Sequence, residues 1–131
     1  SENAVQPVAV SQFYASPAWP NPSDPSFVNA VARVETALDP ASLMELLAQI
    51  ENSFGRVRKT RNAPRTLDLD LIDYEGRIEA GPPVLPHPRI ADRDFVLVPL
   101  RDVAPDWRHP VTGRSVDELI AALPQVTVTK L

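Results

Sequence analysis

The chain has 131 residues, with 13 Lys or Arg, 17 Asp or Glu, two His and no Cys. The net charge of −4 disfavours a broad nucleic-acid or membrane-surface binder, and the missing cysteines exclude disulfides, thiol nucleophiles and thiolate-bound zinc. The length fits one domain over residues 1–131 with one core, and the 15 prolines indicate stiff connecting loops.

Two strands are predicted before residue 36, on either side of a proline-rich loop. Residues 8–14 are rich in β-branched and aromatic side chains, which is typical of a strand. The prolines between residues 16 and 25 exclude a helix or a central strand and predict a rigid loop around Trp19. Residues 27–35 alternate between two faces, which predicts a half-buried strand.

A helix is predicted from Asp39 to Gly55. Asp39 is an N-cap residue, Pro40 suits the first helical position, and apolar residues then recur at helical spacing. Residues 56–65 follow as a basic loop. The further predicted elements are a strand at 66–73, loops through 74–93, a short buried strand at 95–98 stopped by Pro99, and a helix at 116–123 opened by the capping box of Ser115 and Glu118. This order predicts an α+β fold with helices packed on one face of a mainly antiparallel sheet.

The segment Leu67-Asp68-Leu69-Asp70-Leu71 is the clearest chemical signal in the sequence. On a strand, Asp68 and Asp70 share one face with their Cα atoms about 7 Å apart, while the leucines face the core. Two carboxylates at this spacing can hold small cations, and oxygen-only ligands favour Mg²⁺ together with substrate phosphates. The alternative is an amphipathic strand with a solvated acidic face.

A cluster of cations precedes the acidic segment: Arg56, Arg58, Lys59, Arg61 and Arg65. Arginines that neutralise phosphate oxygens beside Mg²⁺ are typical of triphosphate chemistry. A solvated basic loop is the alternative. Asn29, on the same face as Phe27, suits hydrogen bonding to a heterocycle stacked on the ring, or is a polar outer residue. His87, between two prolines, suits a phosphate donor or a turn.

These motifs resemble a known family. The sequence from Asn62 to Ile72 resembles the signature of the 6-hydroxymethyl-7,8-dihydropterin pyrophosphokinases of folate biosynthesis. Further stretches that resemble the family are 13–17, 27–30, 54–58, 85–89 and 93–100. The resemblance implies a ferredoxin-like α+β fold and a transferase that moves pyrophosphate from ATP to the pterin hydroxymethyl group and releases AMP. The sequence shows no targeting signal, which fits a cytoplasmic enzyme.

The resemblance also implies a role for individual residues. Asp68 and Asp70 would hold two Mg²⁺ ions between ATP and the pterin, and Arg56 and Arg65 would stabilise charge on the transferred group from a catalytic loop. Predicted ATP contacts are Glu51, Arg58, Leu71, His87 and Arg93. Predicted pterin contacts are Phe27 and Phe95 on the ring faces, Asn29 at the ring edge, and Ser16 and Trp19 mainly through their backbones. The implied partners are ATP and the pterin alone, with no nucleic acid or membrane, in a monomer or weak homodimer.

The sequence departs from the family at its start. Family members usually begin with a strand, a Gly-Ser-Asn turn and a helix, a unit of about 30–40 residues that this sequence lacks. The catalytic loop is one residue shorter than in some members, and Asn62 replaces an aromatic. Alternatives to the enzyme are therefore a non-catalytic nucleotide- or pterin-binding relative and an inactive fragment. A further alternative is a nucleic-acid-binding α+β module that uses the basic loop at residues 56–65.

Overall fold

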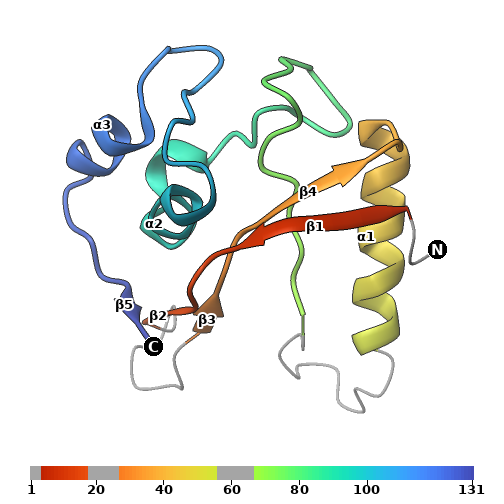
Figure 1. The fold of residues 1–131 in the computed structure, drawn as a ribbon, viewed down its shortest axis with the longest axis horizontal. Helices are drawn as coiled ribbons and strands as arrows, with labels where there is room; N and C mark the ends of the chain where they lie inside the picture. The colour runs from red at the N-terminus through yellow and green to blue at the C-terminus, as the bar shows by residue number, and fades with distance from the viewer. Residues whose placement is uncertain (1–3, 18–26, 56–66) are drawn as a thin grey trace. The chain divides into compact units, whose positions relative to one another are not determined.

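The computed structural model describes residues 4–17, 27–55 and 67–131 (Figure 1). The chain forms two compact units, Ser1–Thr36 with Pro88–Leu131, and Ala37–His87. The first unit contains β1 (Val5–Val10), β2 (Tyr14–Ser16), β3 (Phe27–Asn29), β4 (Ala32–Thr36), the 3-10 turn η1 (Ile90–Asp92), α2 (Asp94–Val103), α3 (Val116–Ala121) and β5 (Thr129–Lys130), and the second contains α1 (Pro40–Gly55). Antiparallel strands and helices make this an α+β fold, as the sequence predicts.

The strands of the first unit form two small antiparallel sheets. β1 pairs with β4, and β2 lies between β3 and β5 (Figure 1). The register of β1 shifts between Pro7 and Ala9, so that Val8 is an extra residue opposite β4. A proline has no N–H to donate to the ladder, which is why it is tolerated at such an irregular edge position.

Both long strands predicted in the first third of the chain are wrong in their extent, because each is broken in two. The breaks meet at Ser11 and Val31. The Ser11 N–H donates to the Val31 carbonyl at 2.9 Å, and the Val31 N–H donates to the Ser11 hydroxyl at 2.9 Å. A side-chain hydroxyl that accepts a backbone N–H competes with the ladder. Each chain segment therefore changes sheet at this point.

The predicted strand at residues 95–98 is also wrong, because these residues lie in α2. The helix begins with the Leu97 N–H donating to the Arg93 carbonyl at 2.9 Å, and Pro99 lies within it. Short apolar runs do not distinguish a strand from a buried helix. In α2, the five consecutive residues 96–100 are all buried, whereas a half-buried strand would bury every second residue. The buried positions of α2 are Val96, Leu97, Val98, Pro99, Leu100 and Val103.

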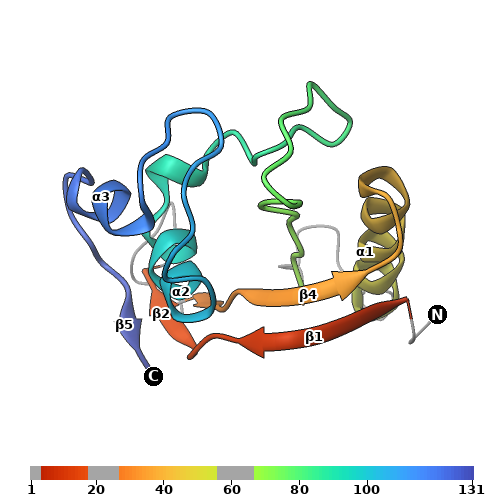
Figure 2. The same cartoon turned by 45° about the horizontal axis from the view of Figure 1, so that its top comes forward.

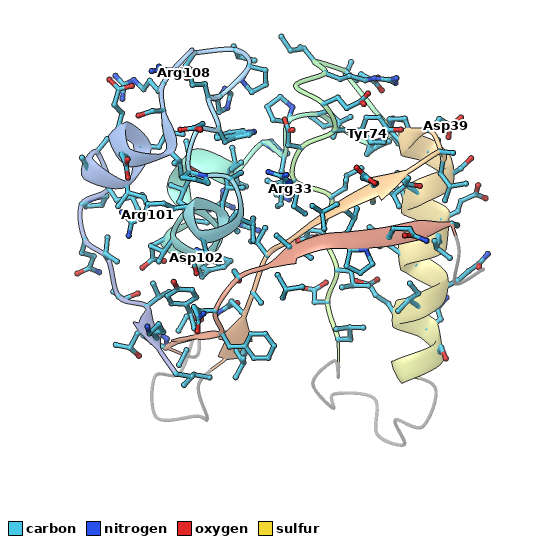
Figure 3. All side chains as sticks on the ribbon, viewed as in Figure 1. Arg33, Asp39, Tyr74, Arg101, Asp102 and Arg108 are labelled. Atoms are coloured by element: carbon cyan, nitrogen blue, oxygen red, sulfur yellow. The ribbon has the colours of Figure 1, made fainter. Side chains whose placement is uncertain are left out.

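Helix α2 is the centre of packing in the first unit. It contacts all four strands β1–β4 and also α3 (Figure 2). From β4, Arg33 donates to the Val103 carbonyl at 3.3 Å, which places a cation at the C-terminal end of the helix (Figure 3). The predicted capping box at Ser115 is confirmed, and α3 ends at Ala121, two residues earlier than predicted. The short strand β5 was not predicted.

The second unit contains the predicted helix α1 with the expected bounds. Asp39 accepts a hydrogen bond from the Ser42 N–H at 2.8 Å, as an N-cap residue does. The Tyr74 hydroxyl donates to the Leu38 carbonyl just before the helix (Figure 3). A loop follows through most of residues 74–93, as predicted.

Candidate active-site residues

The acidic segment after residue 66 does not form the predicted strand. Residues 67–73 have no regular secondary structure, and residue 66 lies outside the described residues. Two of its backbone groups are bonded elsewhere: the Leu69 N–H donates to a Glu51 carboxylate oxygen, and the Ile72 carbonyl accepts from the His87 N–H at 2.8 Å. These two hydrogen bonds satisfy backbone groups that a neighbouring strand would otherwise pair.

The predicted alternation of side chains is nevertheless confirmed in this segment. Asp68 and Asp70 are exposed, while Leu67, Leu69 and Leu71 are partly buried. The three leucines therefore lie on the more buried side of the segment, and both aspartates lie on the exposed side. This is the pattern that the sequence indicates for the candidate metal segment.

Glu51 connects the acidic segment to helix α1. Its side chain is partly buried near the end of the helix, and its Oε2 atom accepts the Leu69 N–H between the two aspartates. A hydrogen bond to an ionised acceptor is stronger than a neutral one. The sequence predicts a nucleotide contact for Glu51 but gives no indication of this backbone contact. A glutamate on the half-buried side of α1 is the only signal that could have suggested it.

The donor set of Asp68 and Asp70 fits a hard cation. Two exposed carboxylates and no sulfur or nitrogen ligand suit Mg²⁺, which takes one or two protein carboxylates and completes its shell with water or phosphate. Within residues 4–17, 27–55 and 67–131, no group of three or more His, Asp or Glu could hold a metal ion. The pair therefore suits a metal shared with a phosphate ligand rather than a closed protein site.

The predicted ring-edge residue Asn29 lies at the end of β3, beside β2. Its Nδ2 atom donates to the Ser16 hydroxyl at 2.8 Å and lies 3.5 Å from the Tyr14 carbonyl oxygen. Ser16 is buried at 6% exposure, and Asn29 is partly buried. The side chain of Ser16 thus has a partner that the sequence does not indicate, since the role predicted for Ser16 is mainly through its backbone.

Strand β2 is itself tied to α2. The Tyr14 hydroxyl donates to Asp102 Oδ2 at 2.6 Å, and the Gln12 N–H donates to the same oxygen at 3.2 Å. Asp102 lies near the end of α2 (Figure 3). The hydrogen bond to Asp102, followed by burial of the ring, raises the pKa of Tyr14 above its usual value of 10.0. The tyrosine remains a donor, and β2 has a fixed position against the helix.

The two predicted ring-face residues belong to elements that contact each other, β3 and α2. Phe27 is 50% exposed, and Phe95 is partly buried at the start of α2. Among the described residues, Phe27 and Phe95 make no ring contact with one another. The Arg93 guanidinium lies 5.4 Å from the centre of the Phe95 ring, within cation–π range. One face of Phe95 therefore already has a partner.

Of the remaining predicted site residues, two lie in the described part of the chain and four lie outside it. Leu71 is partly buried within the acidic segment, and His87 is bonded to it through its backbone N–H. The loop residues of the prediction lie outside the described residues: Trp19, Arg56, Arg58 and Arg65.

The sequence is similar to a known family model and to several named proteins. Residues 1–105 match the family model of 7,8-dihydro-6-hydroxymethylpterin-pyrophosphokinase. A Synechocystis protein named 2-amino-4-hydroxy-6-hydroxymethyldihydropteridine pyrophosphokinase is 42% identical over 111 residues, 84% of this chain and 56% of that protein. A Pseudomonas aeruginosa protein of the same name is 43% identical over 125 residues, 95% of this chain and 76% of the relative.

A third relative is much longer. The match to a folic acid synthesis protein of Dictyostelium discoideum, 40% identical, spans 86% of this chain and 17% of that protein. The chain thus spans only part of the relatives that it matches. No helix in the described part of the chain is long and apolar enough to cross a membrane. The family model covers most of the sequence, and the chain belongs to the 7,8-dihydro-6-hydroxymethylpterin-pyrophosphokinase family.

Proposed function

We propose that the protein transfers pyrophosphate from ATP to the hydroxymethyl group of 6-hydroxymethyl-7,8-dihydropterin and releases AMP. Membership of the family and relatives of that name at 42% and 43% identity support the proposal. The observation that carries it is the acidic segment, in which Asp68 and Asp70 are exposed while a partly buried glutamate binds the backbone between them.

Asp68 and Asp70 would hold Mg²⁺, two ions in our proposal, beside the ATP phosphates. When bound, the metal would neutralise negative charge on the phosphates. The two carboxylates need no proton transfer for this task, and the Glu51 hydrogen bond would keep their segment in place. Arg56 and Arg65, outside the described residues, would add positive charge beside the transferred group. Positioning and electrostatics account for most of such a reaction.

The other residues would bind the two substrates. Phe27 and Phe95 would stack on the pterin ring and Asn29 would bond to its edge, with backbone contacts from Ser16 and Trp19. Glu51, Arg58, Leu71, His87 and Arg93 would contact ATP. Since Arg93 lies against the Phe95 ring, we infer that Arg93 also orders the ring for stacking.

We also propose the detailed fold, the number of domains, the location and the oligomeric state of the protein. A ferredoxin-like sheet-and-helix sandwich is supported by antiparallel strands with α2 packed on them. We propose further that residues 1–131 unfold as one domain, and that the protein is a cytoplasmic monomer or weak homodimer without nucleic-acid or membrane partners. A single cooperative transition in denaturant and a monomeric mass in solution are the results expected.

The test is AMP release by the 131-residue chain from ATP and Mg²⁺, with and without 6-hydroxymethyl-7,8-dihydropterin. We expect AMP that depends on the pterin and is abolished by Asp70→Asn. The matched control is Asp106→Asn, which removes an exposed carboxylate from the other unit and should leave the rate unchanged. Normal turnover by Asp70→Asn at saturating Mg²⁺ would refute the metal assignment.

The alternative is a binding protein without catalysis. Pterin and ATP binding with no AMP release would support this alternative, or an inactive fragment, over the enzyme. Testing the same chain with the N-terminal segment of a homologous enzyme added would separate the two, since only a fragment would gain activity.

A further inference from the structure

The C-terminal segment of the chain is bonded to the start of helix α2. Thr127 donates twice to the Asp94 Oδ2 atom, from its backbone N–H at 2.6 Å and from its hydroxyl at 3.0 Å. Hydrogen bonds to an ionised acceptor are about twice as strong as neutral ones. The two bonds therefore make a firm link between residues that are 33 positions apart in the sequence. We call residues 127–131 the C-terminal strap.

The other end of the strap is fixed to strand β2. In the antiparallel pairing of β5 with β2, Thr129 lies opposite Ala15. The Leu131 N–H donates to the Phe13 carbonyl at 2.9 Å. Figure 1 shows the segment after α3 reaching β5 beside β2. The strap thus connects the first turn of α2 with the middle strand of the β3–β2–β5 sheet.

The chain enters α2 with only a weak restraint at Arg93. This residue is the N-cap of the helix, and its side chain makes no capping hydrogen bond among the described residues. Its backbone N–H lies 3.5 Å from the Ile90 carbonyl oxygen, a long distance for a hydrogen bond. The bonds between Asp94 and Thr127 are shorter, so they restrain the entry to α2 more firmly.

Asp94 lies between two residues that have a proposed role in substrate binding. Arg93 precedes it, Phe95 follows it, and the Arg93 guanidinium lies 5.4 Å from the centre of the Phe95 ring. All three residues are partly buried. Because planar peptide bonds join them, a restraint on Asp94 also limits the movement of its two neighbours.

We propose that Asp94 and Thr127 are positioning residues, and that the C-terminal strap holds Arg93 in place for binding ATP. The inference rests on the proposed function, in which Arg93 contacts ATP. The negative charge of Asp94 by itself opposes the binding of a polyphosphate. Any benefit of Asp94 to ATP binding must therefore come through its bonds to Thr127. By thermodynamic reciprocity, bound ATP must stabilise the strap in return.

The experiment measures the equilibrium dissociation constant of α,β-methylene ATP with Mg²⁺ for the wild-type chain and two variants. This analogue resists cleavage at the bond that the proposed reaction breaks. Asp94→Ala should weaken binding by about tenfold, since it loses two bonds to a charged acceptor. Asp94→Asn keeps an oxygen acceptor without the charge, and should stay within about threefold of wild type. Tighter binding by both variants would show that charge alone acts and would overturn the proposal.

The matched control is Asp92→Ala. It removes an exposed carboxylate from the same stretch of chain, one that pairs with Arg89 and not with the strap. This variant loses a negative charge as Asp94→Ala does, and should not weaken binding. Weakening equal to that of Asp94→Ala would contradict a role of the strap.

Hydrogen exchange gives a second readout, which a purely structural bond would not change. In the wild-type chain, the nucleotide analogue should slow exchange of the Thr127 and Leu131 amides by about tenfold more than it slows exchange in α3. The amides of α3 report any general stabilisation by the ligand. Equal slowing in the strap and in α3 would contradict the coupling.

Thermal unfolding of each variant without ligand checks that it folds. If Asp94→Ala is too unstable to measure, Thr127→Val removes only the 3.0 Å bond and should weaken binding by about twofold to threefold. Unchanged nucleotide binding by Asp94→Ala and Thr127→Val would overturn the role of the strap and leave the proposed function intact. A wild-type chain that binds no nucleotide would overturn both.

Discussion

The two groups of candidate site residues are held in place by different means. In the acidic segment, Asp68 and Asp70 are exposed, and the Leu69 N–H between them donates to the Glu51 carboxylate. Beside β2, the carboxamide of Asn29 is held by a buried hydroxyl within a frame of paired strands. The two exposed carboxylates, the proposed metal ligands, should therefore be removable with little effect on folding, whereas changes around Asn29 and the buried Ser16 should affect stability.

The largest expected effect is on the rate, from Asp68→Asn. Removing one carboxylate of the pair should lower AMP formation by about a thousandfold, within the range known for losing a group that stabilises transition-state charge. Because Asp68 is exposed, the free energy of unfolding should change by less than about 0.5 kcal/mol. Steady-state AMP release and urea unfolding measure the two quantities. A large loss of stability would contradict the contrast drawn above.

A smaller loss of rate is expected when the support of the segment is removed. Glu51→Ala deletes the acceptor of the Leu69 N–H. Loss of a residue that supports metal ligands without binding the metal itself typically lowers activity or metal affinity by about 10–100-fold. Glu51→Gln keeps an oxygen acceptor and should retain more of the activity at raised Mg²⁺. Titration of the rate with Mg²⁺ gives the comparison. Equal losses in both variants would indicate that the charge of Glu51, not its bond to the backbone, matters.

Around β2 the expected effect is on stability. Tyr14→Phe removes the donor to Asp102 and should lower the free energy of unfolding by about 1–2 kcal/mol, since the acceptor is charged and the ring is buried. Asp102 keeps the Gln12 N–H as a partner. Urea unfolding measures the loss. Phe13→Leu, which changes an exposed neighbouring ring, is the control and should have little effect.

The smallest effect is the dependence of stability on pH. The Ser42 N–H lowers the pKa of Asp39, and the Ser115 N–H lowers the pKa of Glu118, so both favour the carboxylate in the folded state. Their contribution is present above the unfolded pKa values of about 4 and is lost as pH falls through the lowered folded values. The raised pKa of Tyr14 acts oppositely, with stability lost as pH rises beyond about 10.

Urea midpoints between pH 2 and pH 11 test both limbs of this profile. Asp39→Asn with Glu118→Gln should flatten the acid limb and leave the alkaline one unchanged. Tyr14→Phe should flatten the alkaline limb alone. An acid limb unchanged in the double variant would show that other carboxylates account for it.

Local signals predicted the helices that begin with a side-chain cap. Asp39 before Pro40 and the pair of Ser115 and Glu118 mark helix starts within a few residues, so α1 and the start of α3 follow from the sequence. Helix α2 has no such cap, and its apolar run is equally typical of a strand. The burial of residues 96–100 depends on the strands and helix packed around α2, which no local pattern contains.

In the candidate site, too, the sequence predicts the local pattern but not the contacts between distant residues. The exposure of Asp68 and Asp70 follows from alternation with leucine, which needs no knowledge of a partner strand. The contacts of Glu51 with Leu69 and of Ser16 with Asn29 join residues that are far apart along the chain. Side-chain bonds of this kind depend on strand register and helix placement, and so they become visible only in the folded structure.

The irregularity at Pro7 has a consequence for how molecules meet in concentrated solution. Among the described residues, β1 pairs with β4 alone, so its other edge is unpaired within that sheet, and Val8 and Val10 beside it are exposed. An incoming strand would meet a register irregularity between Pro7 and Ala9. An irregular edge is a poor template for intermolecular strand addition. We therefore expect this irregularity to protect an apolar surface from fibril-like aggregation.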